Sequence, residues 1–295
     1  MEVTYWDIFL NSFVEFGSYT WGEISLQTSP WYINYFVWLT FLSLFLWGVE
    51  IIFPWRRNQS VFRKDFWLDL FYMYFNFYLF KLIIFIAFST VVEHWFTDVF
   101  GGDLSKFALV NLKGFPNWLQ LIIFFVALDF VQWITHICLH RFRFLWRFHQ
   151  VHHSVKEMGF AAHFRYHWME NVIYTPVKYL AMMLIGDFNP EQAFIVYYIS
   201  IAIGHLNHAN IRFDYGWLRF IFNNPRMHIW HHSKILPGEK KYGVNFGISL
   251  SCWDYLFKTS YLPADGRDIP LGFEGDERFP KNFFKQLLVG FKIKP

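Results

Sequence analysis

The chain has 295 residues, enough for one large domain or two small ones. Hydrophobic residues make up 55%, aromatic residues 24% and charged residues only 17%, against roughly 25% charged in typical soluble domains. The 15 Trp, 16 Tyr and 39 Phe suit lipid-facing helices with aromatic residues at the membrane interfaces. This composition excludes an ordinary soluble protein and predicts a polytopic membrane protein. The formal net charge of +3 is small, and we expect no nucleic-acid partner.

Three long apolar segments predict transmembrane helices. Trp31 to Phe53 is long enough to cross a hydrocarbon core of about 30 Å. Phe66 to Val92 is the second predicted span, and Asn117 to Leu139 is the third. The residues before Trp31 are interpreted as an N-terminal tail. This tail contains acidic residues and no Lys or Arg, so it does not resemble a cleavable signal peptide.

The second half of the chain is less regular. Two shorter apolar segments, Val172 to Ile185 and Ala193 to Ile203, predict a helical hairpin. At 1.5 Å per residue neither segment comfortably spans a bilayer. From His205 onward the chain is polar and rich in Gly and Pro, which predicts a cap outside the membrane. The final amphipathic stretch, Phe283 to Phe291, predicts an interfacial helix.

The predicted fold is therefore all-α: a polytopic membrane helical bundle of three long spans and a short helical hairpin, with a cytosolic histidine-rich cap that holds a di-metal site. We divide the chain into residues 1–116 (tail and first two spans), 117–262 (catalytic region) and 263–295 (cytosolic tail). Lys and Arg are absent from the tail but frequent in residues 54–65 and 141–170. By the positive-inside rule, the N-terminus lies outside, and the histidine clusters and C-terminus lie in the cytoplasm of a bacterial inner membrane or an ER-type membrane.

The clearest functional signal is a set of clustered histidines. Five lie between His136 and His153, at spacings of four, nine, three and one residue. On a helix, residues three and four apart share a face, so each cluster can aim its imidazoles at one point. A lone histidine would more often be an interface residue, but a repeated His-x2-His-His is hard to explain by packing. The pattern predicts metal binding by His136, His140, His149, His152, His153, His228, His231 and His232.

Eight imidazoles exceed what one tetrahedral zinc can use, so we infer two metals that share the set. Imidazole suits iron, zinc, copper and nickel but not magnesium or calcium. A metal pair at a lipid interface, without a redox-active cysteine pair, fits iron and oxygen activation for attack on unactivated C–H bonds. Zinc hydrolysis would need an added general base, and the chain has no His-Glu-x-x-His. We predict two iron ions, O2 as co-substrate, and no catalytic residues beyond the metal ligands.

Other histidines lie between the clusters. His208 and His167 are predicted as further ligands, although His167 could instead orient a ligand by hydrogen-bonding to it. Glu170, three residues after His167, suits that orienting role as well. His205, one turn before His208, is a weaker candidate, and His163 is interpreted as structural.

Two aspartates have open or structural interpretations. Asp129 lies two helical turns before His136 on the same face, so it could accept a ligand's N–H or bond another helix. Asp254 is expected to close the cap by hydrogen bonds, without a catalytic role.

With these residues, the chain resembles the fatty acid hydroxylase/sterol desaturase superfamily of integral-membrane di-iron oxygenases. The shared pattern is His-x3-His, His-x2-His-His and His-x2-His-His, carried by the eight histidines above, and the resemblance covers roughly Asn117 to Tyr261. Flanking matches are Asp129, Trp146-Arg147-Phe148, Ser154, Arg165-Tyr166-His167 with Glu170, His208-Ala209-Asn210, Asn224-Pro225-Arg226-Met227, Tyr242-Gly243 and Trp253-Asp254-Tyr255-Leu256-Phe257. Lys240-Lys241 departs from the acidic residue and asparagine that members often carry there.

The resemblance implies a helical membrane bundle under a cytosolic cap that holds two metals. It also implies O2, an external reductant and the oxidation of a membrane lipid. No cytochrome b5-like domain is evident, so we expect electrons from a separate cytochrome b5-, ferredoxin- or reductase-like protein.

Three functions are compatible with these features. The first is hydroxylation of a C–H bond in an acyl chain or a sterol-like lipid. The alternative is lipid or sterol desaturation at the same site. A less favoured hypothesis, from another class, is a non-enzymatic metal-binding or transport protein, whose histidines should line a path through several spans.

Overall fold

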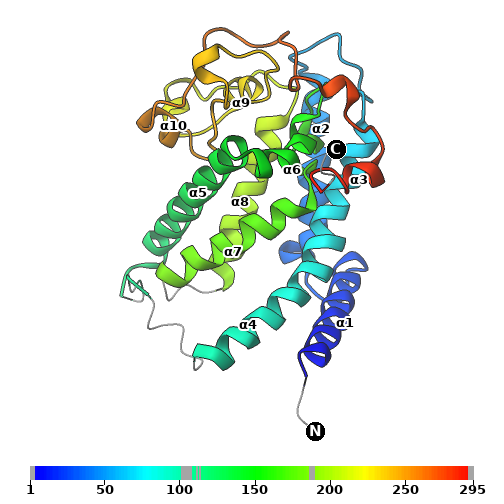
Figure 1. Cartoon of the computed structure of the whole chain (residues 1–295), viewed down its shortest axis with the longest axis vertical. Coiled ribbons are helices and arrows are strands. Elements are labelled where there is room, and N and C mark those ends of the chain that lie inside the picture. The colour runs from blue at the N-terminus through cyan, green and yellow to red at the C-terminus, as the bar shows by residue number, and fades with distance from the viewer. Residues whose placement is uncertain (1–3, 101–107, 111, 113, 186–189, 292–295) are drawn as a thin grey trace.

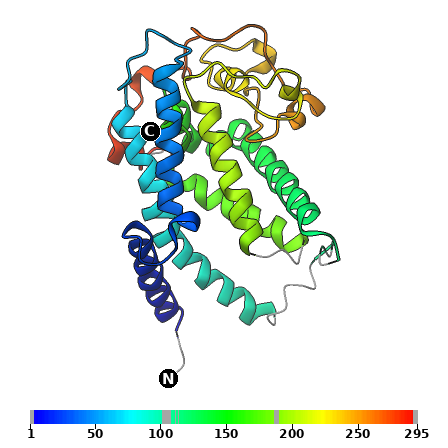
Figure 2. The ribbon, with the colours of Figure 1, turned by 180° about the vertical axis from the view of Figure 1, so that it is seen from behind.

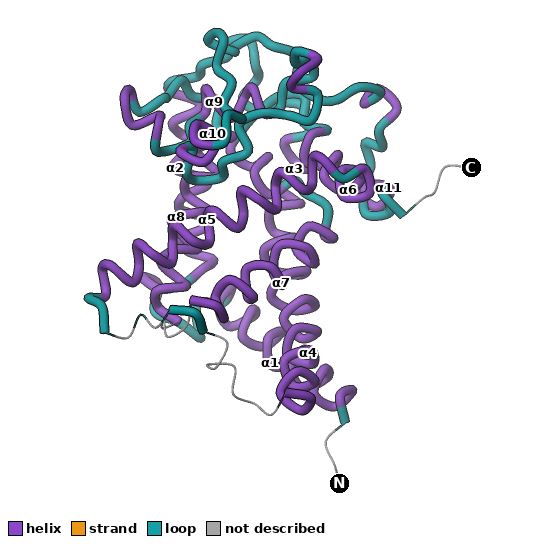
Figure 3. Tube along the Cα trace, turned by 60° about the vertical axis from the view of Figure 1, so that its left-hand side comes forward, coloured by secondary structure: helices purple, strands orange, loops and turns teal. Residues whose placement is uncertain are grey.

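The computed structural model describes residues 4–100, 108–110, 112, 114–185 and 190–291. Within these ranges the regular structure is helical, and only two isolated β-bridges occur, Phe222 with Leu250 and Ser233 with Leu271. The predicted all-α class is confirmed for the described part of the chain. Figure 3 shows the helices below a cap that consists mostly of loops.

The elements are α1 (Tyr5–Ile24), α2 (Tyr35–Ile52), α3 (Phe66–Tyr74), the π-helical segment η2 (Phe75–Phe85), α4 (Ile86–Phe100), α5 (Asn117–Arg141), α6 (Arg143–His153), the 3₁₀ turn η4 (Phe160–Phe164), α7 (Trp168–Ile185), α8 (Pro190–His208), α9 (Pro225–His231), α10 (Cys252–Leu256) and α11 (Phe283–Gln286).

Two described helices, α2 and α5, are long and apolar enough to cross a membrane. Their mean hydropathies are 1.8 and 1.9, and only 22% and 39% of the residues are buried inside the molecule. Large apolar side chains such as Phe41 and Phe45 on α2 are exposed, as lipid-facing residues would be. These helices correspond to the first and third predicted spans.

The second predicted span, Phe66 to Val92, is helical but divided between α3, η2 and α4. It is not one of the two candidate spans, so its crossing of the membrane stays a prediction. Its polar residues bond neighbouring segments. Asp69 pairs with Arg63 (2.5 Å) and Arg165 (3.1 Å), and the Asn76 amide donates to the carbonyls of Phe164 and Tyr166 at 2.9 Å. These bonds attach α3 and η2 to the η4 region next to the histidines.

The N-terminal region, interpreted above as a tail, forms the 20-residue helix α1. Thr4 and Asp7 form a capping box at its start, which is a local signal for a helix N-terminus. Figure 1 shows α1 beside α4 at the end of the molecule away from the cap. Phe9 and Phe88 pack with ring centroids 4.8 Å apart, and the Tyr5 hydroxyl donates to Asp98 at 2.9 Å.

Helix α5 packs against α6, α7 and α8, and α9 packs against α8, so these five helices surround the site. Both hairpin helices extend beyond their predicted apolar cores, with 18 residues in α7 and 19 in α8. Residues 186–189, which lie between the two predicted segments, are outside the described residues. Figure 2 shows α8 and α5 running up to the cap, where both helices end in histidines.

Beyond α8 the chain forms the cap with the short helices α9 and α10 (Figure 1). The predicted interfacial helix over Phe283 to Phe291 is shorter in the structure. Its one helical turn, α11, turns Phe283 toward the rings of Tyr72 and Phe75, at 4.9 Å in each case. Packing on α3 and η2 therefore holds Phe283 inside the molecule, while Phe284 stays exposed.

Candidate metal centre

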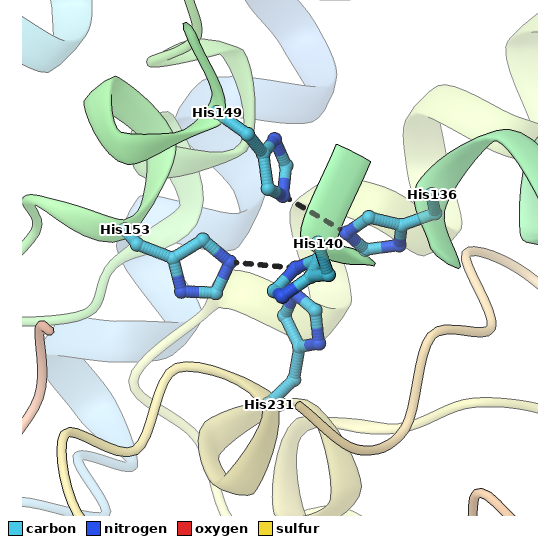
Figure 4. Close-up of side chains that lie close together, drawn as sticks. All are labelled: His136, His140, His149, His153 and His231. Carbon is cyan, nitrogen blue, oxygen red and sulfur yellow. Dashed lines mark hydrogen bonds between the residues drawn. The ribbon is translucent and has the colours of Figure 1, made fainter. Parts of the chain in front are cut away.

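The histidines from all three boxes meet in two groups. Within each group, one nitrogen from every member lies within 4.8 Å of the others. The first group is His136, His140, His149, His153 and His231, and the second is His152, His208, His228 and His232. The eight box histidines and His208 thus share two adjacent clusters, as the count of imidazoles predicted. Figure 4 shows the first group converging from three segments of the chain.

Helix geometry explains how one box serves two groups. On α6, His149 and His153 are four residues apart and point to the first group, whereas His152 points to the second. The third box is divided in the opposite way. His228 and His232 belong to the second group, and His231 belongs to the first. Each His-x2-His-His therefore lies between the two groups and supplies both.

The imidazole nitrogens within a group lie unusually close together. In the first group, His136 Nε2 is 3.1 Å from His149 Nε2, and His153 Nε2 is 3.2 Å from His140 Nε2 (Figure 4). In the second, His208 Nε2 lies 2.9 Å from His228 Nε2 and 3.3 Å from His152 Nε2. Neighbouring nitrogen ligands on a metal with bonds of about 2.0–2.1 Å lie roughly 2.9–3.4 Å apart, so these distances fit shared coordination.

The protonation of these rings shows that a cation fits between them. His208 Nδ1 donates to the Gly204 carbonyl at 2.7 Å, and His152 Nδ1 donates to the Arg165 carbonyl at 3.1 Å. In the neutral rings, both Nε2 atoms then carry lone pairs, which face each other without a proton between them. A metal ion would bind both lone pairs. The donor set of the second group therefore fits a metal that prefers imidazole.

The first group shows the same arrangement. His136 Nδ1 donates to the Phe246 carbonyl at 2.8 Å, and His149 Nδ1 lies 3.0 Å from Glu170 Oε2. Their Nε2 lone pairs face each other as well. His231 Nδ1 donates to the Val244 carbonyl at 2.8 Å, and its Nε2 is buried with no partner among the described residues. The unpaired nitrogen of His231 is the atom that would bind a metal.

Burial favours the neutral, metal-binding form of the imidazoles on and next to α6 and α9. Burial, strengthened by repulsion between neighbouring rings, lowers the pKa of each well below its ordinary value of 6.5. These residues are His149, His152, His153, His228, His231 and His232.

Backbone carbonyls orient three ligands of the first group from a single segment, residues 242–246. His140 bonds the backbone of Tyr242, His231 the carbonyl of Val244, and His136 the carbonyl of Phe246. Carbonyls of alternate residues thus fix the ring orientation of these imidazoles, a role typical of groups behind metal ligands. Sequence reasoning missed these contacts because every residue has a carbonyl. The only local signal was the Tyr242-Gly243 match.

Two buried side chains hold this segment. The Asn245 amide donates to the carbonyls of Met227 (2.8 Å) and Tyr261 (2.7 Å). Asp254 accepts from the backbone N–H groups of Phe246 (2.9 Å) and Gly247 (2.7 Å). The carboxylate also accepts from the Trp133 indole and the Thr259 hydroxyl. The backbone N–H groups of Thr259 and Ser260 donate to the backbone carbonyl of Asp254. The predicted structural role of Asp254 is confirmed.

Replacing Gly243 tests whether the segment of residues 242–246 orients the histidines of the first group. Its φ of +108° is unfavourable for other residues, and an added Cβ would lie 2.9 Å from His140 Nδ1. We expect Gly243→Ala to displace His140 and to lower metal affinity by about 10- to 100-fold, the usual effect of disturbing groups behind ligands. Titration of bound metal on the purified protein measures the change. Gly238→Ala, where a Cβ meets no atom within 4 Å, is the control and should bind metal normally. Equal affinities in the two variants would contradict the assigned role.

Comparison with known proteins agrees with this geometry. A family model described as fatty acid hydroxylase matches residues 121–259, which contain all nine histidines of the two groups. Over these residues the chain is similar to the fatty acid hydroxylase family.

Two named proteins are similar to part of this chain. The ornithine lipid hydroxylase of Rhizobium tropici is 31% identical over 180 residues, which cover 61% of this chain and 52% of the relative. The alkylglycerol monooxygenase of Caenorhabditis elegans is 26% identical over 195 residues, which cover 63% of this chain and 35% of the relative. The chain thus spans about half the length of the first relative and about a third of the second. No solved structure matches the chain.

His167 does not join either histidine group. Its Nε2 lies 2.9 Å from the Leu287 carbonyl, and its Nδ1 accepts from the Met169 N–H at 3.1 Å. Both ring nitrogens therefore already have backbone partners, so the interpretation of His167 as a ligand is corrected. Glu170, which we had associated with His167, instead bonds the ligand His149.

His205 and His163 form a pair outside the two groups. Their Nδ1 atoms lie 2.8 Å apart, and His205 Nε2 lies 3.4 Å from the Ser43 hydroxyl. His163 borders the second group, with its ring centroid 5.3 Å from that of His208. Asp129 bonds the cap instead of a ligand. It accepts from the backbone of Ser249 (2.9 Å) and from two further N–H groups.

A cavity of about 740 Å³ lies beside both groups. His136 and His149 of the first group and His208 of the second lie in its wall. The remaining wall is mostly apolar and comes largely from α5, α7 and α8, with Tyr35, Phe77 and Phe164 from neighbouring segments. Ligand pockets commonly measure about 300–1,000 Å³, so a small lipid or part of a larger one can enter beside the histidines.

Proposed function

We propose that this chain is a membrane-bound di-iron oxygenase that hydroxylates a C–H bond of a lipid, either an acyl chain or a sterol-like molecule. The observation that carries the proposal is the pair of imidazole groups, with facing lone pairs, at one end of a largely apolar cavity. The match of residues 121–259 to the fatty acid hydroxylase family supports it.

Each histidine group would hold one iron ion. His136, His140, His149, His153 and His231 would hold one iron, and His152, His208, His228 and His232 the other. Bound iron supplies the ability to activate O2. In the overall reaction one oxygen atom enters the C–H bond, and the other becomes water with two electrons and two protons from a separate donor. The apolar wall holds the hydrocarbon and excludes water from the reacting carbon.

Desaturation by the same site is the alternative. It differs in the fate of the substrate after hydrogen removal, which the ligand set does not determine. Hydroxylation is favoured because both relatives are named as a hydroxylase or a monooxygenase. Metal transport is disfavoured, since the histidines gather at the cap end of α5 and α8 instead of forming a path along these helices.

The proposed surroundings follow from the charge pattern and the helices. We infer a multi-pass protein with its N-terminus outside and its metal site and C-terminus in the cytoplasm. Residues 117–262 would be the catalytic region, after a tail and two spans (1–116) and before a cytosolic tail (263–295). A separate cytochrome b5-, ferredoxin- or reductase-like protein would deliver the electrons.

Lipid profiles of the native host with and without this gene test the function. The host without the gene should lack a hydroxylated lipid. If it lacked a lipid double bond instead, the result would favour the desaturase. His152→Ala and His231→Ala, one from each group, should each abolish restoration of the product while the protein still inserts in the membrane. Turnover retained by either variant would contradict its role as a ligand.

A further inference from the structure

Three helices line most of the cavity beside the histidines, which is called the slot below. Each helix contributes a row of four residues spaced four apart, which is called a stripe below. From its first to its last residue each stripe extends over twelve steps of the helix, or about 18 Å. These stripes are Phe124, Leu128, Gln132 and His136 on α5; Glu170, Tyr174, Lys178 and Met182 on α7; and Val196, Ser200, Gly204 and His208 on α8.

The two ends of the slot differ in chemistry. His136, Glu170 and His208 end the three stripes on the side of the metal groups. At the opposite end, Phe124 and Val196 belong to an apolar cluster that also includes Met182. A bound molecule would therefore meet the metal groups at one end of the slot and apolar side chains at the other.

One residue departs from this pattern. Lys178 is the only Lys or Arg among the described residues that line the slot, and it lies eight residues, about 12 Å of helix, from Glu170. No described carboxylate lies within ion-pairing distance of it. Its Nζ makes a cation–π contact with the Tyr174 ring, whose centroid lies 5.6 Å away.

The acidic groups near Lys178 already have partners. Glu170 bonds His149 at 3.0 Å. Asp129 interacts with Lys178 electrostatically, but its oxygens accept three N–H groups of the cap segment. A cation without a paired anion in an apolar cavity is costly. A ligand with its own negative charge would compensate that cost.

Two buried amides add a second polar feature between Lys178 and the metal groups. Asn171 Nδ2 and Asn207 Oδ1 have no hydrogen-bond partner among the described residues, and both side chains line the slot. The rest of each amide is held in place: Asn171 Oδ1 accepts from the Tyr166 hydroxyl, and Asn207 Nδ2 donates to the Ile248 carbonyl at 2.8 Å. A free donor and a free acceptor suit a ligand group that both accepts and donates, such as an amide or a hydroxyl.

We propose that Lys178 binds the anionic group, a carboxylate or phosphate, of an acidic lipid whose reacting carbon lies at the histidines. Asn171 and Asn207 would hold an amide or hydroxyl of the same molecule between these points. This inference rests on the proposed function and narrows its substrate to acidic lipids. Lys178 is then the residue that selects the substrate and sets its depth in the slot.

Binding of three probes to the full-length protein in nanodiscs tests the site. N-palmitoylglycine and hexadecyl phosphate are acidic, and N-palmitoylglycine methyl ester is the neutral match of the first. The wild-type protein should bind at least one acid about tenfold more tightly than the ester, and the tighter acid identifies the anion. Lys178→Met should remove this preference without weakening the ester, and Lys178→Arg should keep it.

Thr175→Val, which removes a polar group from the same face of α7, is the control and should keep the preference. A wild-type protein without preference would overturn the proposal, as would equal loss of all three probes in Lys178→Met. Binding needs no turnover, so the two proposals can fail separately. An intact preference without oxidation of any lipid would contradict only the proposed function.

Discussion

Replacing His208 with alanine should remove one of two metals from this protein and nearly all of its activity. His208 Nε2 contacts both His228 Nε2 (2.9 Å) and His152 Nε2 (3.3 Å), so its loss opens the centre of the second group. Disturbing groups behind a ligand already costs about 10- to 100-fold in activity. We therefore expect a loss of at least about 100-fold for the ligand itself, with the first group still loaded. Metal analysis and lipid turnover on the same preparation measure both effects.

His205→Ala is the matched control. His205 is also a buried histidine near the end of α8, one turn before His208, but it bonds His163 and Ser43 instead of joining a group. This variant should be less stable than wild type yet retain both metals. If His205→Ala lost a metal and His208→Ala did not, the assignment of ligands on α8 would be reversed.

Asp254→Asn should have the second largest effect, through the segment that orients the first group. The carboxylate accepts the N–H groups of Phe246 and Gly247 and the Trp133 indole, and it is fully buried. An amide in its place would present N–H groups to some of these donors. Leaving buried donors unpaired costs about 1–3 kcal/mol each, so we expect a loss of roughly 3 kcal/mol in unfolding free energy. Denaturant unfolding in detergent micelles measures this loss.

Asp214→Asn provides the control for Asp254→Asn. Asp214 forms a partly exposed ion pair with Arg226, and such pairs contribute about 0–1 kcal/mol. It should change stability little and leave the first group intact. Asp254→Asn should also weaken metal binding by His136, whose Nδ1 bonds the Phe246 carbonyl. Stability equal to that of Asp214→Asn would show that Asp254 does not support the segment.

The grouping of the box histidines could be predicted from the sequence because a histidine cluster is a local pattern. The spacing on α6 also explains why one box supplies both groups. His149 and His153 are four residues apart and belong to the first group, whereas His152 belongs to the second. The carbonyls that orient the ligands could not be predicted. Phe246 lies 110 residues from His136, and only the fold brings them together.

His167 shows how sequence proximity can mislead. It lies close to the second box and next to Glu170, but the C-terminal segment supplies the Leu287 carbonyl that its Nε2 bonds. That partner is 120 residues away in the chain. Helix α1 had a local signal, the capping box of Thr4 and Asp7, which was overlooked because the region is less apolar than the predicted spans.

Lys178 could not be singled out from the sequence. In an apolar helix, a single lysine usually extends toward the membrane surface. Only the arrangement of α5, α7 and α8 shows that Lys178 lines the slot, away from free carboxylates. The residues proposed to bind metal are thus visible in the sequence, whereas the residue proposed to select the substrate is revealed only by how the helices pack.

Metal content is the most direct test of a di-iron centre in this chain. The nine histidines form two groups with facing lone pairs, so each group should hold one ion. Protein purified from its native host should contain about two iron ions per chain by elemental analysis. About one metal per chain, none, or two ions of another metal would contradict the di-iron assignment.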